Sequence, residues 1–162
     1  LGVGLGWQKE EFDTPGVNFE DRAEIFWETL DICKLLWQDS PISFHGKQFH
    51  FDDIWCHPKP AQGQDLPLLF GLKMTNENAQ RIAKVGHGWI PIKTSRDFIS
   101  QGRDILAEAF INEGRQDQPR IRSQLPTCVD DNGVPNIDLT LNELKKSMAS
   151  CSFANALSLV YE

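Results

Sequence analysis

The chain of 162 residues has no uninterrupted apolar run of 18 residues, the length that a membrane-spanning helix needs. It also lacks the basic and then apolar opening that is typical of a signal peptide. Positive charge is in short supply, and the formal net charge of −7 argues against nucleic acid or an anionic membrane as the main partner. We therefore expect a cytoplasmic protein with no nucleic-acid and no membrane partner.

Cysteine is scarce and scattered, at positions 33, 56, 128 and 151, with no Cys-x-x-Cys pair. In an acidic chain without a signal peptide, such cysteines are expected to be reduced and mostly buried thiols. Their spacing does not fit the ligand spacing of a structural zinc site. The histidines at 45, 50 and 57, beside Asp52 and Asp53, could be imagined as a metal cluster, but a hairpin does not bring all of them to one point. We predict no metal site.

Aromatic and aliphatic residues are plentiful, with 40% hydrophobic content, five Trp and ten Phe. That supply is enough for one hydrophobic core, and the length is about that of one domain. We therefore expect residues 1–162 to form a single domain.

A long helix is predicted from Phe19 to about Gln38, with Asn18 as its N-terminal cap. Its apolar residues recur at steps of three and four, which predicts one strongly apolar face that needs a large partner surface, such as a sheet. Alternating residues then predict a small β-hairpin near residues 42–52.

The stretch from Pro67 to Pro91 has the order of a βαβ unit. A short apolar run stops at Gly71, a helical pattern begins at Asn76, glycines end the helix, and a second apolar run begins at Trp89. In such units ligands lie where a strand ends and a helix begins, and the free N–H groups of the helix suit a phosphate. The turn from Gly71 to Asn76 is therefore either a phosphate site or only a tight connection.

The rest of the chain predicts further regular elements without internal repeats. A helix follows Ser95, is weakened at Gly102 and ends at Gly114. The later predicted elements are a strand over 120–129, a loop over 130–136, a helix over 141–148 and a final apolar strand or helix over 156–161.

The first residues carry glycine at every second position, Gly2-x-Gly4-x-Gly6. The dinucleotide fingerprint fails, because Trp7 stands where the third glycine would have to be and no helix follows directly. Two interpretations remain: a strand whose glycines admit another backbone, or a strand that a flat ligand ring approaches.

Taken with Glu10-Glu11-Phe12, the opening Gly2 to Trp7 segment resembles the bacterial luciferase-like flavin monooxygenases, above all the branch that uses a deazaflavin in place of FMN. Other matching segments, in the same order and spacing, are 44–46 with Phe51, 58–60 and the stretch 67–91. The resemblance covers about residues 1–95.

The resemblance implies an α/β fold, namely a partial (half) TIM-type (β/α) barrel with parallel strands and a small β-hairpin insertion near 42–52. A complete barrel of this type takes at least ~200 residues and typically ~250. By the resemblance, Leu1 lies near the fourth barrel strand and the first three strands are lacking, together with much of the substrate pocket.

The resemblance also implies a cofactor site for FMN or a deazaflavin. Gly4, Gly6 and Trp7 match the strand end that lies along the cofactor ring, and the loop from Gly71 to Thr75 matches the one that holds its phosphate.

Within this loop, Leu72 stands where the family usually has a second glycine, which removes backbone freedom. Lys73 and Thr75 could partly compensate with a charge and a hydroxyl. No catalytic acid or base can be nominated.

Three hypotheses follow. The chain is a fragment or shortened form of a flavin- or deazaflavin-dependent oxidoreductase, with cofactor-mediated hydride transfer or monooxygenation. Alternatively, it is a catalytically inactive half-barrel that serves as an interaction or assembly module and self-associates, as a dimer or higher assembly, to cover its open edge. A third hypothesis is that it is one piece of a full-length gene product.

Overall fold

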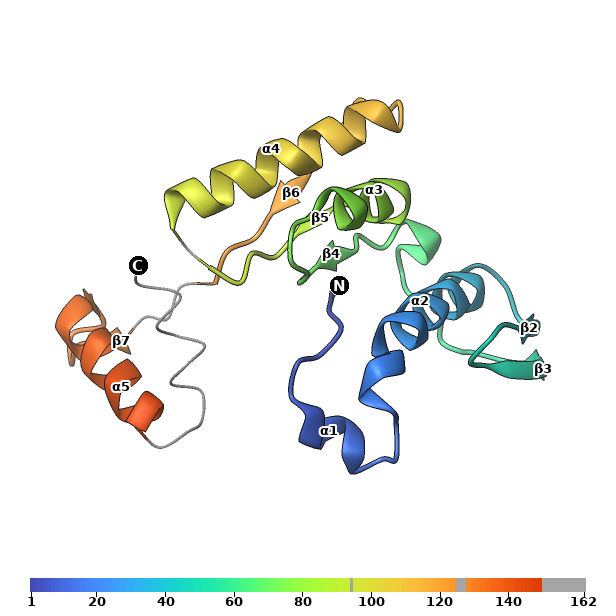
Figure 1. The fold of residues 1–162 in the computed structure, drawn as a ribbon, viewed down its shortest axis with the longest axis horizontal. Helices are drawn as coiled ribbons and strands as arrows, with labels where there is room; N and C mark the ends of the chain where they lie inside the picture. The colour runs from blue at the N-terminus through green and yellow to red at the C-terminus, as the bar shows by residue number, and fades with distance from the viewer. Residues whose placement is uncertain (94, 125–127, 150–162) are drawn as a thin grey trace. The chain divides into compact units, whose positions relative to one another are not determined.

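The structure is a computed structural model that describes residues 1–93, 95–124 and 128–149 (Figure 1). The chain divides into two compact units, Leu1–Gly71 and Leu72–Glu162, and each is described by itself. The expectation of one domain over residues 1–162 stays a prediction.

The first unit contains short strands, two α-helices and two single 3₁₀ turns. In chain order they are β1 (Gly2–Val3), α1 (Lys9–Asp13), η1 (Phe19–Asp21), α2 (Arg22–Gln38), β2 (Ile42–His45), β3 (His50–Ile54), η2 (Gly63–Asp65) and β4 (Leu69–Phe70).

Among its described residues, the second unit contains three helices with short strands between them. In chain order they are α3 (Asn76–Val85), β5 (Gly88–Trp89), α4 (Arg96–Asn112), β6 (Arg120–Ile121), β7 (Cys128–Val129), β8 (Pro135–Asn136) and α5 (Ile137–Ala149).

Parallel pairing occurs within each unit, as the α/β prediction requires. In the first unit β1 pairs with β4, with Gly2 opposite Leu69. In the second unit β5 pairs with β6, with Gly88 opposite Arg120. The predicted order of strand, helix and strand in the Pro67 to Pro91 stretch is confirmed as β4, α3 and β5.

The long helix predicted from Phe19 to about Gln38 is confirmed as α2, with a difference at its first turn. The Asn18 side chain accepts a hydrogen bond from the Glu20 backbone N–H at 3.2 Å, but the turn it caps is the 3₁₀ turn η1. The α-helix proper starts at Arg22. Its apolar face packs on β4, where the Trp27 ring stacks on Phe70 with 5.7 Å between ring centroids.

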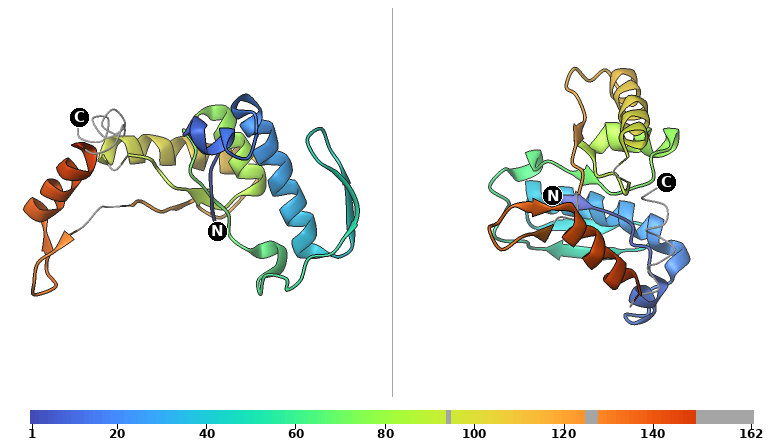
Figure 2. Two further views of the ribbon diagram at one scale, coloured as in Figure 1. Left: turned by 90° about the horizontal axis from the view of Figure 1, so that it is seen from below. Right: turned by 90° about the vertical axis from the view of Figure 1, so that its left-hand side faces the viewer.

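The predicted hairpin is confirmed and extends to Ile54. Strands β2 and β3 are antiparallel, with Phe44 opposite Phe51 and these two rings stacked at 6.1 Å. The hairpin lies beside α2 (Figure 2). This small sheet is separate from the parallel pair of its unit.

The core of the second unit forms between α3, α4 and β5, and α3 and α4 lie against each other (Figure 1). Trp89, Ile82, Leu106 and Phe110 are completely or almost completely buried there. Gly102, predicted only to weaken α4, has a packing role, because a Cβ atom at this position would lie 2.3 Å from the Trp89 ring.

The prediction of one strand over residues 120–129 is wrong. Strand β6 pairs with β5, whereas β7 pairs with β8 in a separate antiparallel hairpin. The predicted loop over 130–136 contains the turn of this hairpin, where the Asp130 carboxylate accepts hydrogen bonds from the Asn132 and Val134 backbone N–H groups. The helix predicted over 141–148 begins earlier, at Ile137.

The predicted stretch 156–161 and Cys151 lie outside the described residues. None of the described helices is long and apolar enough to cross a membrane.

Candidate cofactor site

The end of β1 and the end of β4 come close together in the first unit. The Gly71 backbone N–H donates to the Val3 carbonyl at 2.7 Å, and a Cβ atom on Gly4 would lie 3.2 Å from the Gly71 carbonyl oxygen. The predicted residues Gly4 and Gly71 are therefore neighbours. The close approach of the two backbones already accounts for a small residue at position 4.

Gly6 and Trp7 follow at the start of the next loop. Gly6 has a φ of +75°, a conformation that L-residues with a side chain rarely adopt, and a Cβ there would lie 2.8 Å from the Phe12 ring. The Trp7 side chain is 61% exposed. This loop thus presents a large, solvent-accessible aromatic surface directly after a backbone position that requires glycine.

Leu72 opens the turn that leads into α3, and its side chain is only 4% exposed. Its carbonyl accepts a hydrogen bond of 2.8 Å from the Trp89 indole Nε1. Leu72 therefore takes part in the core of the second unit through its side chain. Only its backbone remains available to a ligand.

Thr75 is the N-cap of α3. Its hydroxyl oxygen accepts a hydrogen bond from the Asn78 backbone N–H at 3.2 Å, and its carbonyl accepts the first helical bond from Ala79 at 2.8 Å. The Asn78 side-chain amide donates to the Lys73 carbonyl at 2.9 Å. The turn is thus a capped and internally bonded entry to a helix.

Lys73 lies on the exposed side of this turn. Its ammonium makes no hydrogen bond or ion pair with any residue in the part of the chain that the structure describes. A positive charge and the N-terminus of a ten-residue helix are thus placed within one turn. Both favour an anion, so the residues present fit a phosphate group.

Two residues of this turn's surroundings were missed by the sequence analysis. Asn78 could have been found, because an amide in the first turn of a helix is placed to bond the residues before it. Trp89 carried no such signal, because its partner Leu72 is 17 residues away along the chain.

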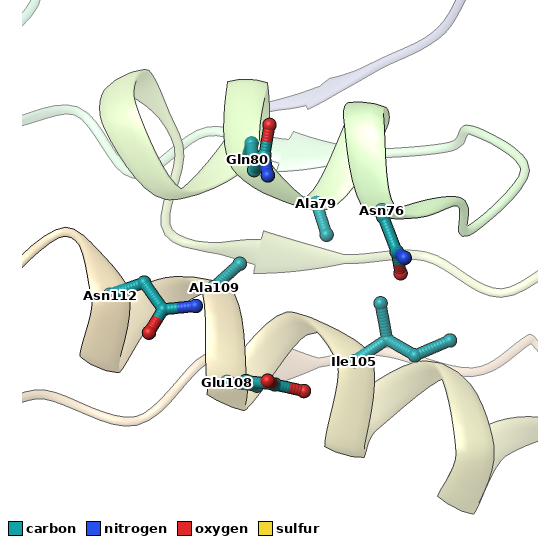
Figure 3. Close-up of a pocket in the computed structure, with 7 residues that line it drawn as sticks. All are labelled: Asn76, Ala79, Gln80, Ile105, Glu108, Ala109 and Asn112. Atoms are coloured by element: carbon teal, nitrogen blue, oxygen red, sulfur yellow. The ribbon is translucent and has the colours of Figure 1, made fainter.

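A shallow cavity of about 130 Å³ lies between α3 and α4 (Figure 3). Its floor is apolar and its rim polar, with the lining residues Asn76, Ala79, Gln80, Ile105, Glu108, Ala109 and Asn112. None of the predicted cofactor residues lines it. Asn76, the residue after Thr75, is among the residues that line it.

The histidines of the hairpin do not gather into a ligand set. His45 Nε2 lies 2.9 Å from an Asp52 carboxylate oxygen, and the rings of His45 and His50 are 6.3 Å apart. Within residues 1–93, 95–124 and 128–149 there is no group of three or more His, Cys, Asp or Glu side chains that could hold a metal ion. The absence of a metal site stays a prediction for the whole chain.

The model of one protein family, luciferase-like monooxygenase, matches residues 1–133. This match confirms the resemblance seen in the sequence and extends it beyond residue 95. Uncharacterized proteins of Mycobacterium tuberculosis and Mycobacterium bovis are each 32% identical over 122 residues, which is 75% of this chain and 42% of theirs.

A relative with a named activity is the F420-dependent hydroxymycolic acid dehydrogenase of Mycobacterium tuberculosis. It is 30% identical over 108 residues, which is 65% of this chain and 26% of the dehydrogenase. The chain therefore spans between a quarter and a little over two fifths of the curated relatives it matches.

Solved structures show the same fold. The monooxygenase RslO1 from Streptomyces bottropensis superposes with a TM-score of 0.75 and 16% identity over 98% of this chain and 50% of its own. The coenzyme F420 dependent tetrahydromethanopterin reductase from Methanopyrus kandleri superposes with a TM-score of 0.61 and 15% identity, over 99% of this chain and 57% of the reductase. An F420-dependent secondary alcohol dehydrogenase with a bound F420-acetone adduct superposes with a TM-score of 0.59 and 20% identity, over 76% of this chain and 37% of the dehydrogenase. At these identities the likeness establishes the fold, a TIM-type barrel, of which this chain is a part.

Proposed function

Because the chain belongs to the luciferase-like monooxygenase family, we propose that it contributes the cofactor phosphate site of an F420-dependent oxidoreductase. The observation that carries the proposal is the 30% identity to an F420-dependent dehydrogenase over 108 residues of this chain. F420 is a deazaflavin, and when bound it would supply hydride transfer. Monooxygenation with FMN is the alternative, which the named curated relative does not favour.

The residues of this chain would bind and orient the cofactor. The turn from Gly71 to Thr75 would hold the phosphate, with the Lys73 ammonium supplying charge and the N-terminus of α3 supplying N–H groups. Thr75 Oγ1 accepts a bond in the cap, which leaves its O–H free to donate. The Leu72 side chain, buried in the core, is not a ligand.

Gly4, Gly6 and Trp7, within the first unit, stay the candidates for contact with the cofactor ring, as the family resemblance implies. The exposed Trp7 indole offers an apolar face that could exclude water from one side of the ring. No residue of the described chain is assigned as a catalytic acid or base, and no substrate is assigned.

The test is a titration of the purified protein with F420 and, separately, with FMN, followed by cofactor fluorescence and thermal unfolding. We expect saturable quenching of F420 and a raised melting temperature. The Lys73→Ala variant should bind F420 more weakly, by roughly 10- to 150-fold, the range of one charge-assisted hydrogen bond. Lys84→Ala, a lysine at the other end of α3, is the matched control.

The absence of quenching and of a thermal shift at millimolar F420 would remove the proposal. Saturable binding of FMN in place of F420 would move the assignment to the flavin branch of the family.

Self-association is a second proposal, and it is compatible with the first. Large apolar side chains outside the candidate cofactor site are exposed on both units, among them Trp55 (65%) and Ile137 (75%). Their burial between copies would remove apolar surface from water. Light scattering at high micromolar concentration should show a dimer or larger species; a clean monomer would contradict it. A cytoplasmic location, with no nucleic-acid or membrane partner, stays a prediction.

A further inference from the structure

The Trp89 indole is a fixed hydrogen-bond donor in the core of the second unit. The side chain is fully buried, and its Nε1 donates to the Leu72 carbonyl at 2.8 Å. Two neighbours on α4 confine the ring, since it lies 5.6 Å from the Phe98 ring centroid and against the backbone of Gly102. The indole therefore has little freedom to move away from the carbonyl.

A fixed carbonyl also fixes the amide that follows it. Among the described residues, the cis peptide bonds are those preceding Pro41 and Pro58, so the bond between Leu72 and Lys73 is trans. In a trans peptide the C=O and the N–H point in opposite directions. Because Trp89 holds the Leu72 carbonyl, the Lys73 N–H is directed away from Trp89.

Asn78 does the same for the next peptide. Its side-chain amide donates to the Lys73 carbonyl at 2.9 Å, so the Met74 N–H is directed away from Asn78. Neither the Lys73 nor the Met74 N–H donates a hydrogen bond to any other residue in the described ranges. Each of these two N–H groups is thus oriented by the carbonyl of its own peptide group, which belongs to the preceding residue. Both N–H groups remain available to donate to a ligand.

We propose that Trp89 and Asn78 are positioning residues of the phosphate turn: they orient the Lys73 and Met74 N–H groups toward the anionic phosphate of the cofactor. Neither residue touches the cofactor in this role. Oriented donors bind an anion more tightly because the ordering of the turn is already complete before binding. The inference rests on the proposed function, and it extends that function to two residues to which the resemblance assigned no role.

Trp89→Phe removes the indole donor and keeps an aromatic ring, and Asn78→Leu removes the amide donor while keeping a good helix former. Each should weaken F420 binding by roughly 3- to 10-fold, the range expected for one hydrogen bond. Binding of the same deazaflavin without its phosphate, the deazaflavin riboside, should not change. Phe110→Leu is the control for a destabilised core, because Phe110 is buried in the same unit and has no bond to the turn.

Amide NMR with inorganic phosphate gives a readout that does not depend on F420. In the wild type, phosphate should shift the Lys73 and Met74 resonances, and in both variants saturation should need more phosphate. Phe110→Leu should behave as the wild type. If Trp89→Phe does not fold, Asn78→Leu carries the test alone.

The outcomes separate the two ideas. A wild type that responds to phosphate at these amides but never binds F420 contradicts the proposed function. If both variants then need more phosphate for saturation, the positioning role is supported without it. Equal weakening of F420 and the phosphate-free riboside, or unchanged phosphate shifts in both variants, overturns the positioning role.

Discussion

Two regions of the molecule are held together in different ways. In the first unit, carboxylates of α2 bind the β2–β3 turn, whereas the second unit is held by apolar side chains packed between α3, α4 and β5. The Glu28 carboxylate accepts hydrogen bonds from three successive backbone N–H groups, those of Lys47, Gln48 and Phe49, at 2.6 to 3.2 Å. Glu24 adds an ion pair of 2.6 Å with the Lys47 ammonium. We call these contacts the carboxylate clasp.

In the second unit, polar contacts join the C-terminal ends of α3 and α4, where Lys84 lies 4.0 Å from Glu113 and Arg115 donates to the Ala83 and Gly86 carbonyls. Between these ends the two helices pack through apolar side chains. Trp89, Ile82, Leu106 and Phe110 are each at most 1% exposed. A polar attachment depends on the charge of its carboxylate, and a packed core depends on the fit of its side chains. The two regions should therefore fail under different perturbations.

The largest expected effect is the loss of a core ring. Phe110→Ala should lower the free energy of unfolding by about 3–5 kcal/mol, because it removes buried apolar surface and leaves a cavity. The neighbouring Ile111 is 67% exposed, so Ile111→Ala should change the free energy of unfolding by no more than about 0.5 kcal/mol. Urea denaturation of both variants measures their free energies of unfolding. Similar losses in the two variants would show that the buried face of α4 is assigned wrongly.

The second effect comes from adding one methyl group. Gly102→Ala should destabilise the protein by about 1–3 kcal/mol, because the new Cβ would lie 2.3 Å from the Trp89 ring, which is itself confined. Helix propensity alone predicts the opposite sign, a gain of about 1 kcal/mol. Gln101→Ala, at an exposed neighbouring position, is the control. A stabilised Gly102→Ala protein would show that the Trp89 ring can move.

The third effect is local and belongs to the clasp. Glu28→Gln keeps the shape of the side chain but loses its charge and one acceptor oxygen, so the three N–H groups of residues 47–49 are left with a single, uncharged acceptor. Hydrogen exchange at residues 47–49 should become faster, with little change in α3 and α4. Asp31→Asn, an exposed acid on the same helix, should leave the turn protected.

The smallest effect is a response of the clasp to pH. Desolvation raises the pKa of Glu28, but the three backbone N–H groups outweigh it and hold this pKa below its usual value. A carboxyl whose pKa is lower in the folded state stabilises the fold at neutral pH and loses this contribution as pH falls through the folded pKa.

Protection of residues 47–49, corrected for intrinsic exchange, should therefore be constant near neutral pH. It should decline as the pH falls below the pKa of an ordinary glutamate, about 4.3. Glu28→Gln should show a flat profile. A wild-type profile that declines already at neutral pH, or one that Glu28→Gln reproduces, would contradict this assignment.

Much of the fold could be predicted because its signals are local. The bounds of α3, Asn76–Val85, follow from apolar spacing and from Gly86 immediately after the helix. The family resemblance carried in the segment from Gly2 to Trp7 was confirmed by the family match. The split of residues 120–129 between two pairings could not be predicted, because each strand's partner is chosen by contacts outside the segment.

The candidate site divides in the same way. The sequence alone determined which residues carry charge, hydroxyl or conformational freedom, namely Lys73, Thr75 and the glycines, since these are properties of single residues. Only the tertiary structure decided that the Leu72 side chain enters the core and that its carbonyl meets the Trp89 indole. The physical reason is that a buried polar group must find a partner wherever the fold supplies one, and the chain order does not say where that is.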